Sequence, residues 1–89
     1  MKPERFICSR HKAEGVFKDK RGRMVSVGFI KKNGSRRVMT AKLAKNSEFS
    51  RRHPYMLVHD MDQSGAYRKV NLKTIQFICD KNEEVYFVD

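Results

Sequence analysis

Carboxylate pairs are the residues of this chain whose spacing would best suit acid–base catalysis. Asp60 and Asp62 are two residues apart, and Glu83 and Glu84 are adjacent. Aspartates that flank a turn commonly accept hydrogen bonds from their own backbone. Two glutamates at the start of a terminal strand are expected to lie in solvent. Neither pair therefore predicts a catalytic site.

Histidine and cysteine side chains also lack a functional pattern. His11, His53 and His59 do not have the spacing of metal ligands. Cys8 and His11 form one ligand pair, but no second CxxC or HxxxH follows to complete a four-ligand site. The chain also contains no GxSxG, P-loop or HExxH motif. We therefore predict that the protein is not an enzyme and uses no metal or cofactor.

Basic side chains give the strongest signal, because they are abundant and unevenly spread. The 89 residues carry a net charge of +10. Residues up to Val58 include sixteen Lys or Arg and four Asp or Glu, whereas residues from His59 onward include four Lys or Arg and six Asp or Glu. Such a charge repels itself, and a polyanion relieves the repulsion while released counterions add affinity. This pattern predicts binding to DNA or RNA. Binding to a membrane is not expected, because no strongly amphipathic basic helix is present.

A predicted β-hairpin positions part of this charge. Asn33-Gly34 is typical of a type I′ turn, and it separates two segments of alternating apolar residues, 24–32 and 36–43. A polar loop follows at 44–54, and a small barrel could fold it toward the same end. The predicted anion-binding residues are those of the hairpin, the loop and the preceding turn, with one aromatic residue: Lys31, Lys32, Arg36, Arg37, Arg51, Arg52, Lys20, Arg21, Arg23 and Tyr55.

Two aromatic residues near the loop arginines leave alternatives open. Tyr55 either stacks on nucleic-acid bases or packs at the edge of its strand. Phe49 either stacks in the same way or anchors the loop in the core.

The remaining chain predicts a mainly β protein of five or six short strands. A short strand and a turn are expected over 16–23, and further strands over 55–60, 67–71 and 83–89. Residues 72–79 are expected to contain a short turn followed by a strand segment with Ile75, Phe77 and Ile78. Gly28 within a strand indicates a bulge or a bend. Residues 1–15 are expected to form an N-terminal arm or short helix, and residues 16–89 a barrel or sandwich domain.

Three segments resemble small SH3-like β-barrel proteins encoded by bacteriophages. They are Asn33–Leu43 at the hairpin, Pro54–Met61 as a central strand and Gly65–Ile78 as a closing segment. The resemblance covers roughly residues 29–79 and implies an SH3-like antiparallel barrel and a phage origin. The resemblance implies little about function. If the chain is phage-encoded, the alternative function is an inhibitor that binds and blocks a host protein, such as one with an acidic surface, or a host nucleoprotein complex.

The expected location follows from what the sequence lacks. No apolar run approaches the roughly 18 residues of a spanning helix, and the N-terminus has no signal-peptide pattern. We therefore expect a cytoplasmic protein, in the host cell if phage-encoded. In that reducing compartment Cys8 and Cys79 are expected to be free, partly buried thiols.

Overall fold

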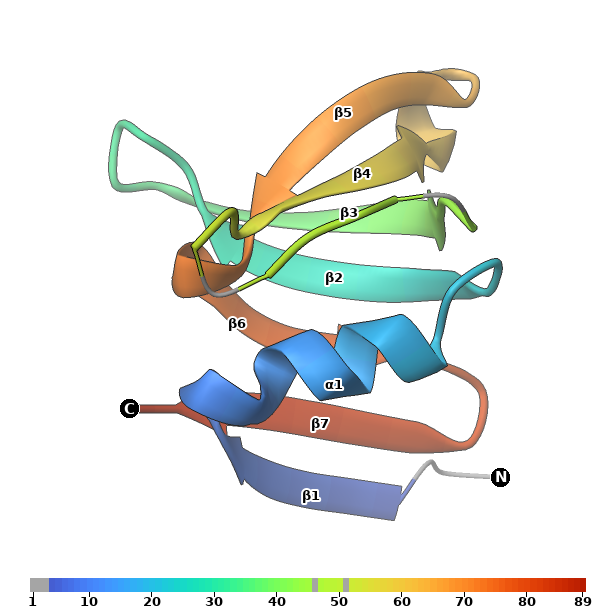
Figure 1. Cartoon of the computed structure of the whole chain (residues 1–89). Coiled ribbons are helices and arrows are strands. Elements are labelled where there is room, and N and C mark those ends of the chain that lie inside the picture. Colours follow the sequence, from blue (N-terminus) through green and yellow to red (C-terminus); the bar gives the residue numbers. More distant parts are fainter. Residues whose placement is uncertain (1–3, 46, 51) are drawn as a thin grey trace.

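Segments with alternating apolar residues form seven strands, which join into one mixed sheet in the order β1-β7-β6-β2-β3-β4-β5 (Figure 1). The structure, a computed structural model, describes residues 4–45, 47–50 and 52–89. Its strands are β1 (Glu4–Ser9), β2 (Met24–Ile30), β3 (Arg36–Leu43), β4 (Tyr55–Asp60), β5 (Ala66–Asn71), β6 (Ile75–Cys79) and β7 (Glu83–Val88).

The sheet is open, with β1 and β5 as its edges. β1 is parallel to β7, and every other neighbouring pair is antiparallel. The mainly β prediction is thus confirmed. The structure differs from the expected barrel in two respects: it has seven strands instead of five or six, and its sheet is not closed.

The N-terminal region is part of this sheet and does not form a separate arm. β1 pairs with β7, the 3₁₀ turn η1 (Arg10–Lys12) follows, and helix α1 covers Ala13–Asp19. The boundary expected at residue 15 falls inside this helix, and the strand predicted over 16–23 is wrong. Ala13 and Phe17 lie four residues apart on one helix face, and both are buried in the common core. Packing of this face, more than local propensity, therefore fixes the helix.

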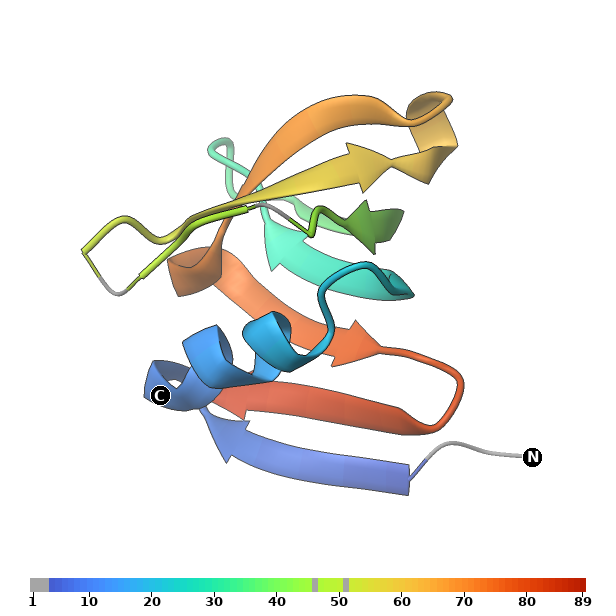
Figure 2. The same cartoon turned by 45° about the vertical axis from the view of Figure 1, so that its right-hand side comes forward.

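Helix α1 covers one face of the sheet, which we call the inner face (Figure 2). Phe17 stacks on Phe87 of β7 with ring centroids 5.8 Å apart. Val27, Met39 and Val58 are completely buried on the same face. Side chains alternate along a strand, so the intervening residues form the opposite, outer face. This alternation determines which Lys and Arg side chains point to the same side of the sheet.

The β2–β3 hairpin lies where the sequence predicts it. Gly34 N donates to the Lys31 carbonyl at 2.9 Å, and Gly34 has a φ of +86°. The expected type I′ turn is wrong, because Asn33 does not have a positive φ. Glycine alone takes the left-handed conformation here, as in hairpin loops that end in a glycine bulge.

Gly28 confirms the predicted irregularity of β2. The β2–β6 register shifts between Gly28 and Phe29. A β-carbon at Gly28 would stand 2.2 Å from the Phe77 ring, which lies over the glycine on the outer face. The glycine is therefore needed for the close approach of this ring.

The 44–54 loop is anchored in the core by Phe49, which is 5% exposed. The Ser47 hydroxyl accepts a hydrogen bond from Leu57 N at 2.8 Å. Lys18 and Arg21 lie over the Phe49 ring, 5.8 and 5.7 Å from its centroid. Of the two roles left open for Phe49, the structure supports the loop anchor.

Cys8 and Cys79 are free and half-buried, as predicted. Cys8 pairs with buried Phe87, whereas Cys79 pairs with Ser26 and Glu84 on the outer face. The two thiols thus point to opposite faces of the sheet. In the described part of the chain, no helix has the length and apolar character needed to cross a membrane.

Candidate functional site

The tip of the β2–β3 hairpin presents three cations to solvent. Lys31, Lys32 and Arg36 are all exposed, and none forms an ion pair with a described residue. Between them the Asn33 side chain accepts hydrogen bonds from Ser35 N and Ser35 Oγ at 3.0 and 2.7 Å. The turn is thus shaped by a neutral side chain. We call Lys31, Lys32 and Arg36 the tip cations.

Arg37 leaves the predicted cluster because it points to the inner face. Its Nη2 donates to the Asp60 carboxylate at 2.9 Å, and Arg68 Nε donates to the same oxygen at 3.0 Å. Asp60 is completely buried. Burial opposes its charge, but the hydrogen bond and charge of Arg37, with the charge of Arg68, lower the pKa of this carboxyl. Arg37 therefore stabilises the fold.

Lys20 also differs from expectation, since only 4% of it is exposed. Its Nζ lies 2.7 Å from Asp80 and also binds Glu83, and Arg23 reaches Asp80 at 3.3 Å. Burial opposes the lysine charge, but the two carboxylates outweigh it and raise the Lys20 pKa. We call these four residues the Asp80 cluster and leave Lys20 and Arg23 out of the candidate surface. Arg21 is exposed but lies over Phe49.

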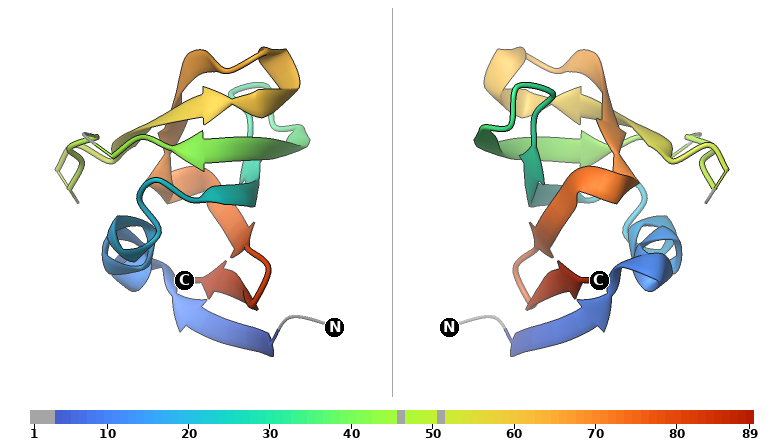
Figure 3. Two further views of the ribbon diagram at one scale, coloured as in Figure 1. Left: turned by 90° about the vertical axis from the view of Figure 1, so that its right-hand side faces the viewer. Right: turned by 90° about the vertical axis from the view of Figure 1, so that its left-hand side faces the viewer.

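Arg52, the loop arginine that the structure describes, does not join the tip cations. Arg52 is exposed, and Arg51 lies outside the described residues. In both views of Figure 3 the described part of the 44–54 loop extends to one side of the molecule, away from the hairpin tip. Of the anion-binding face expected from the sequence, Arg52 and Arg37 therefore do not lie with the tip cations.

Tyr55 is 56% exposed and lies on the outer face of β4. This face holds functional candidates that sequence reasoning missed. Register places Met24, Lys42, His59 and Tyr67 in one row across β2, β3, β4 and β5. The alternation of Lys42 with apolar residues was a usable signal, but the row depends on the pairing of four strands.

The outer face of β2 to β5 carries no carboxylate. Its residues alternate with the buried ones and are Met24, Ser26, Gly28, Ile30, Arg36, Val38, Thr40, Lys42, Tyr55, Leu57, His59, Tyr67, Lys69 and Asn71. Asp60 of β4 is buried on the inner face, and Asp62, just beyond β4, accepts a hydrogen bond from Thr40 N at 3.2 Å. The face therefore has a positive potential and exposed rings.

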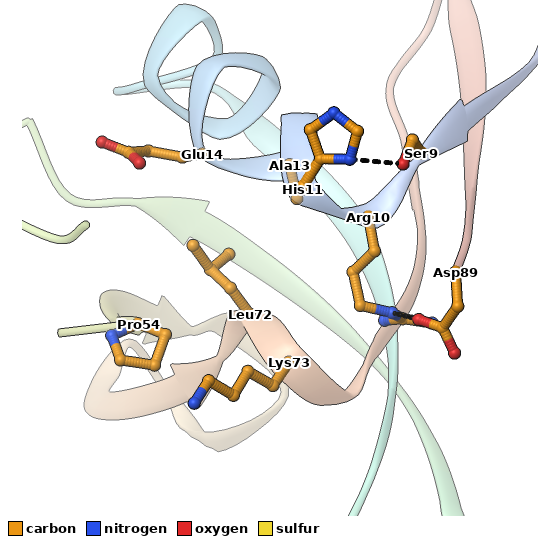
Figure 4. A pocket seen from close by; sticks show the side chains of 9 residues that line it. All are labelled: Ser9, Arg10, His11, Ala13, Glu14, Pro54, Leu72, Lys73 and Asp89. Atoms are coloured by element: carbon orange, nitrogen blue, oxygen red, sulfur yellow. Dashed lines mark hydrogen bonds and ion pairs between the residues drawn. The ribbon is translucent and has the colours of Figure 1, made fainter. Parts of the chain in front are cut away.

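A pocket of about 320 Å³ lies where η1 and the start of α1 meet the 3₁₀ turn η3 (Leu72–Thr74) (Figure 4). Arg10 pairs with Asp89 at 2.8 Å and donates to the Ile75 carbonyl. Lys73 and Glu14 add one charge of each sign to the lining. The lining charges therefore balance, and the pocket has no clear preference for an anion.

Ser9 and His11 meet at the rim of this pocket, with Oγ and Nδ1 2.7 Å apart (Figure 4). A serine nucleophile needs a base whose other ring nitrogen is held by a third group. No described side chain forms a hydrogen bond to His11 Nε2. The contact by itself therefore does not argue for nucleophilic chemistry.

The described residues contain no group of three or more His, Cys, Asp or Glu side chains placed to hold a metal ion. Comparison with known proteins gives no relative: no protein-family model, curated protein or solved structure matches this chain.

Proposed function

We propose that this protein binds nucleic acid through the outer face of β2 to β5 and the adjoining hairpin tip. The observation that carries the proposal is that five cations lie on this surface and that none of them forms an ion pair with a described residue. They are the tip cations with Lys42 and Lys69. Elsewhere many cations face acids, as in the Asp80 cluster.

Electrostatics explains why such a surface suits a polyanion. Repulsion among unpaired cations raises the free energy of the free protein, and phosphates relieve it. Each phosphate contact also releases a condensed counterion, which makes affinity fall with salt. The proposed role is binding without catalysis, in the cytoplasm.

Strand connectivity supports the finer proposal of an SH3-like domain, whereas a phage origin rests on the sequence resemblance alone. β2 to β5 follow one another as a meander, η3 follows β5, and β6 returns to pair with β2. β1, α1 and β7 then extend this unit and cover it. DNA and RNA remain alternatives within the proposal.

Charge reversal tests the proposal. We expect Lys31→Glu with Lys32→Glu to weaken binding of a labelled oligonucleotide, measured by fluorescence anisotropy at several salt concentrations. We define the salt slope as the steepness with which the logarithm of the binding constant falls against the logarithm of the salt concentration. If each lysine contacts one phosphate, this slope falls by about 1.4 for a single strand or about 1.8 for a duplex. The matched control is Lys12→Glu with Lys73→Glu, because both lysines are exposed and lie outside the proposed surface.

Thermal melts confirm that both double variants fold. Equal loss of binding in the two would show that net charge acts globally, and this result would contradict a localised surface. Failure of the unaltered protein to bind any oligonucleotide at low salt would overturn the proposed function.

A second candidate function, binding of a protein partner, is favoured by an apolar row on the other part of the outer face. Register aligns Ile7, Tyr86, Phe77, Gly28 and Val38 across five strands. Ile7 is 79% exposed and Val38 61%. Exposed apolar clusters mark interaction sites.

The partner in this alternative is an acidic host protein or host nucleoprotein complex, if the chain is phage-encoded. A pull-down from nuclease-treated host lysate separates the two functions. Retention of one host protein by the unaltered chain, and its loss with Val38→Asp, would favour the alternative.

A further inference from the structure

We infer that the outer face of β3 to β5 is a stacking platform for single-stranded nucleic acid, with Tyr67 as its main base-contacting residue. The inference rests on the proposed function and names its ligand class and site. Three features carry it: an exposed ring held in place, flanking cations, and the absence of acids on this face.

Tyr67 offers a large ring to solvent in a fixed position. It is 68% exposed and stands beside His59, with the ring centroids 4.4 Å apart. His59 is held in turn, because its Nδ1 lies 3.3 Å from the Gly65 carbonyl oxygen, which can accept a hydrogen bond from the Nδ1–H tautomer. Supported rings lose little conformational freedom when a ligand stacks on them. Tyr55 adds a second exposed ring on β4.

Two lysines flank the rings, one on a neighbouring strand and one on the strand of Tyr67 itself. Lys42 pairs with His59, and Lys69 is two residues from Tyr67 on the same face. Neighbouring strands are about 4.8 Å apart, so the row from Met24 to Tyr67 extends over roughly 14 Å. Neither lysine forms an ion pair with a described residue. Both are therefore free to contact phosphates beside a stacked base.

Stacking distinguishes a single strand from a duplex. Each unpaired base can offer a flat face to an aromatic ring, whereas bases in a duplex are stacked on one another. A protein partner could also pack on tyrosines, but the exposed aliphatic residues that a protein interface buries, Ile7 and Val38, lie on the other part of the outer face. The combination of rings and free cations therefore favours a single strand.

The test uses the full chain, a labelled 12-nucleotide single strand of mixed sequence and the corresponding duplex. The variant is Tyr67→Leu, because leucine keeps apolar bulk against His59 but has no aromatic face. Tyr67→Phe should restore binding if stacking is responsible. Tyr86→Leu is the matched control, since Tyr86 is also partly exposed and contacts a ring, Phe77, but lies on β7.

We expect Tyr67→Leu to weaken single-strand binding by roughly 5- to 150-fold, the range for loss of one stacked base. Duplex binding should change little, and Tyr67→Phe and Tyr86→Leu should bind like the unaltered protein. Thermal melts identify any variant that is not folded, and fluorescence quenching of the tyrosines by the single strand gives an independent measure of stacking.

Two results separate the inference from the function on which it rests. If Tyr67→Leu binds the single strand normally while reversal of Lys31 and Lys32 weakens binding, the platform is wrong and nucleic-acid binding stands. If the unaltered protein binds neither oligonucleotide, both are wrong. Equal loss of binding in Tyr67→Leu and Tyr86→Leu also overturns the platform.

Discussion

The β2–β3 hairpin tip and the β6–β7 turn are both shaped by a side-chain oxygen that accepts a backbone hydrogen bond two residues on. Asn33 accepts from Ser35 N at 3.0 Å, and Asp80 accepts from Asn82 N at 2.8 Å. Around Asn33 the tip cations are exposed, and none of them forms an ion pair with the part of the chain that the structure describes. Around Asp80, Lys20 and Arg23 converge on the carboxylate from a distant part of the chain.

The difference shows that local shape and the use of charge are separate properties of a turn. A neutral Asn33 leaves nearby cations available to a ligand, whereas Asp80 turns nearby cations into part of the fold. Lys20 and Asp80 are only 5% and 6% exposed in their side chains. Exchanging the charge between the two turns, by Asp80→Asn and Asn33→Asp, is therefore the direct way to test the comparison.

The largest effect is expected from Asp80→Asn. Asparagine can still accept the turn hydrogen bonds, but Lys20 loses its buried counterion and keeps only Glu83. Removing one partner of a buried pair costs about 3–5 kcal/mol, and the remaining glutamate places this variant near the lower end. Urea unfolding at neutral pH measures the loss. A change below about 0.5 kcal/mol would contradict a stabilising role for the cluster.

Lowering the pH should reduce the difference in unfolding free energy between the unaltered protein and Asp80→Asn. Burial opposes the charge of Asp80, but Lys20 and the backbone N–H groups of the turn lower its pKa well below the ordinary value. The unfolded chain therefore takes up the proton first, and the stability supplied by the carboxylate is lost as pH falls below about 4. Unfolding free energies from pH 7 to pH 2 should converge. Parallel curves would exclude Asp80 as the source.

Adjacent arginines provide the next comparison. Arg37→Met removes one of two cations from buried Asp60 and should destabilise the protein by about 1.5–3 kcal/mol, the usual range for hydrogen bonds to charged groups. Arg36→Met should change stability by less than about 0.5 kcal/mol, because Arg36 is exposed and unpaired. Denaturant unfolding of both variants checks this order, and equal effects would refute the assignment of the two faces.

The sequence predicts features that depend on a few neighbouring residues. The hairpin at Asn33-Gly34 and the irregularity at Gly28 are of this kind. Alternation with Met39 and Ala41 is a further local signal, which places Arg37 on the inner side of β3, but the prediction of Arg37 as an anion-binding residue did not use it. Its buried partner Asp60 lies 23 residues away.

Features that depend on distant pairing were not predictable in the same way. Lys20 meets Asp80 across 60 residues of sequence, and nothing in either segment specifies this contact. β1 joins β7 from the opposite end of the chain, which brings an expected arm into the sheet. Tyr67 joins the row of Met24, Lys42 and His59 through three successive strand pairings. Its place beside these residues could therefore be seen only in the structure.

The smallest expected effect is that of Asn33→Asp, which gives the hairpin tip the charge that distinguishes the β6–β7 turn. Aspartate can accept the same hydrogen bonds from Ser35, so stability should change by less than about 0.5 kcal/mol. The new carboxylate would neutralise about one tip cation. If that cation contacts a phosphate, the salt slope of nucleic-acid binding should fall by roughly 0.7–0.9. Anisotropy titrations at four salt concentrations measure this slope, with Asn82→Asp at the β6–β7 turn as the control. An unchanged slope would show that the tip cations do not contact the ligand and would leave the platform on β3 to β5 as the whole binding surface.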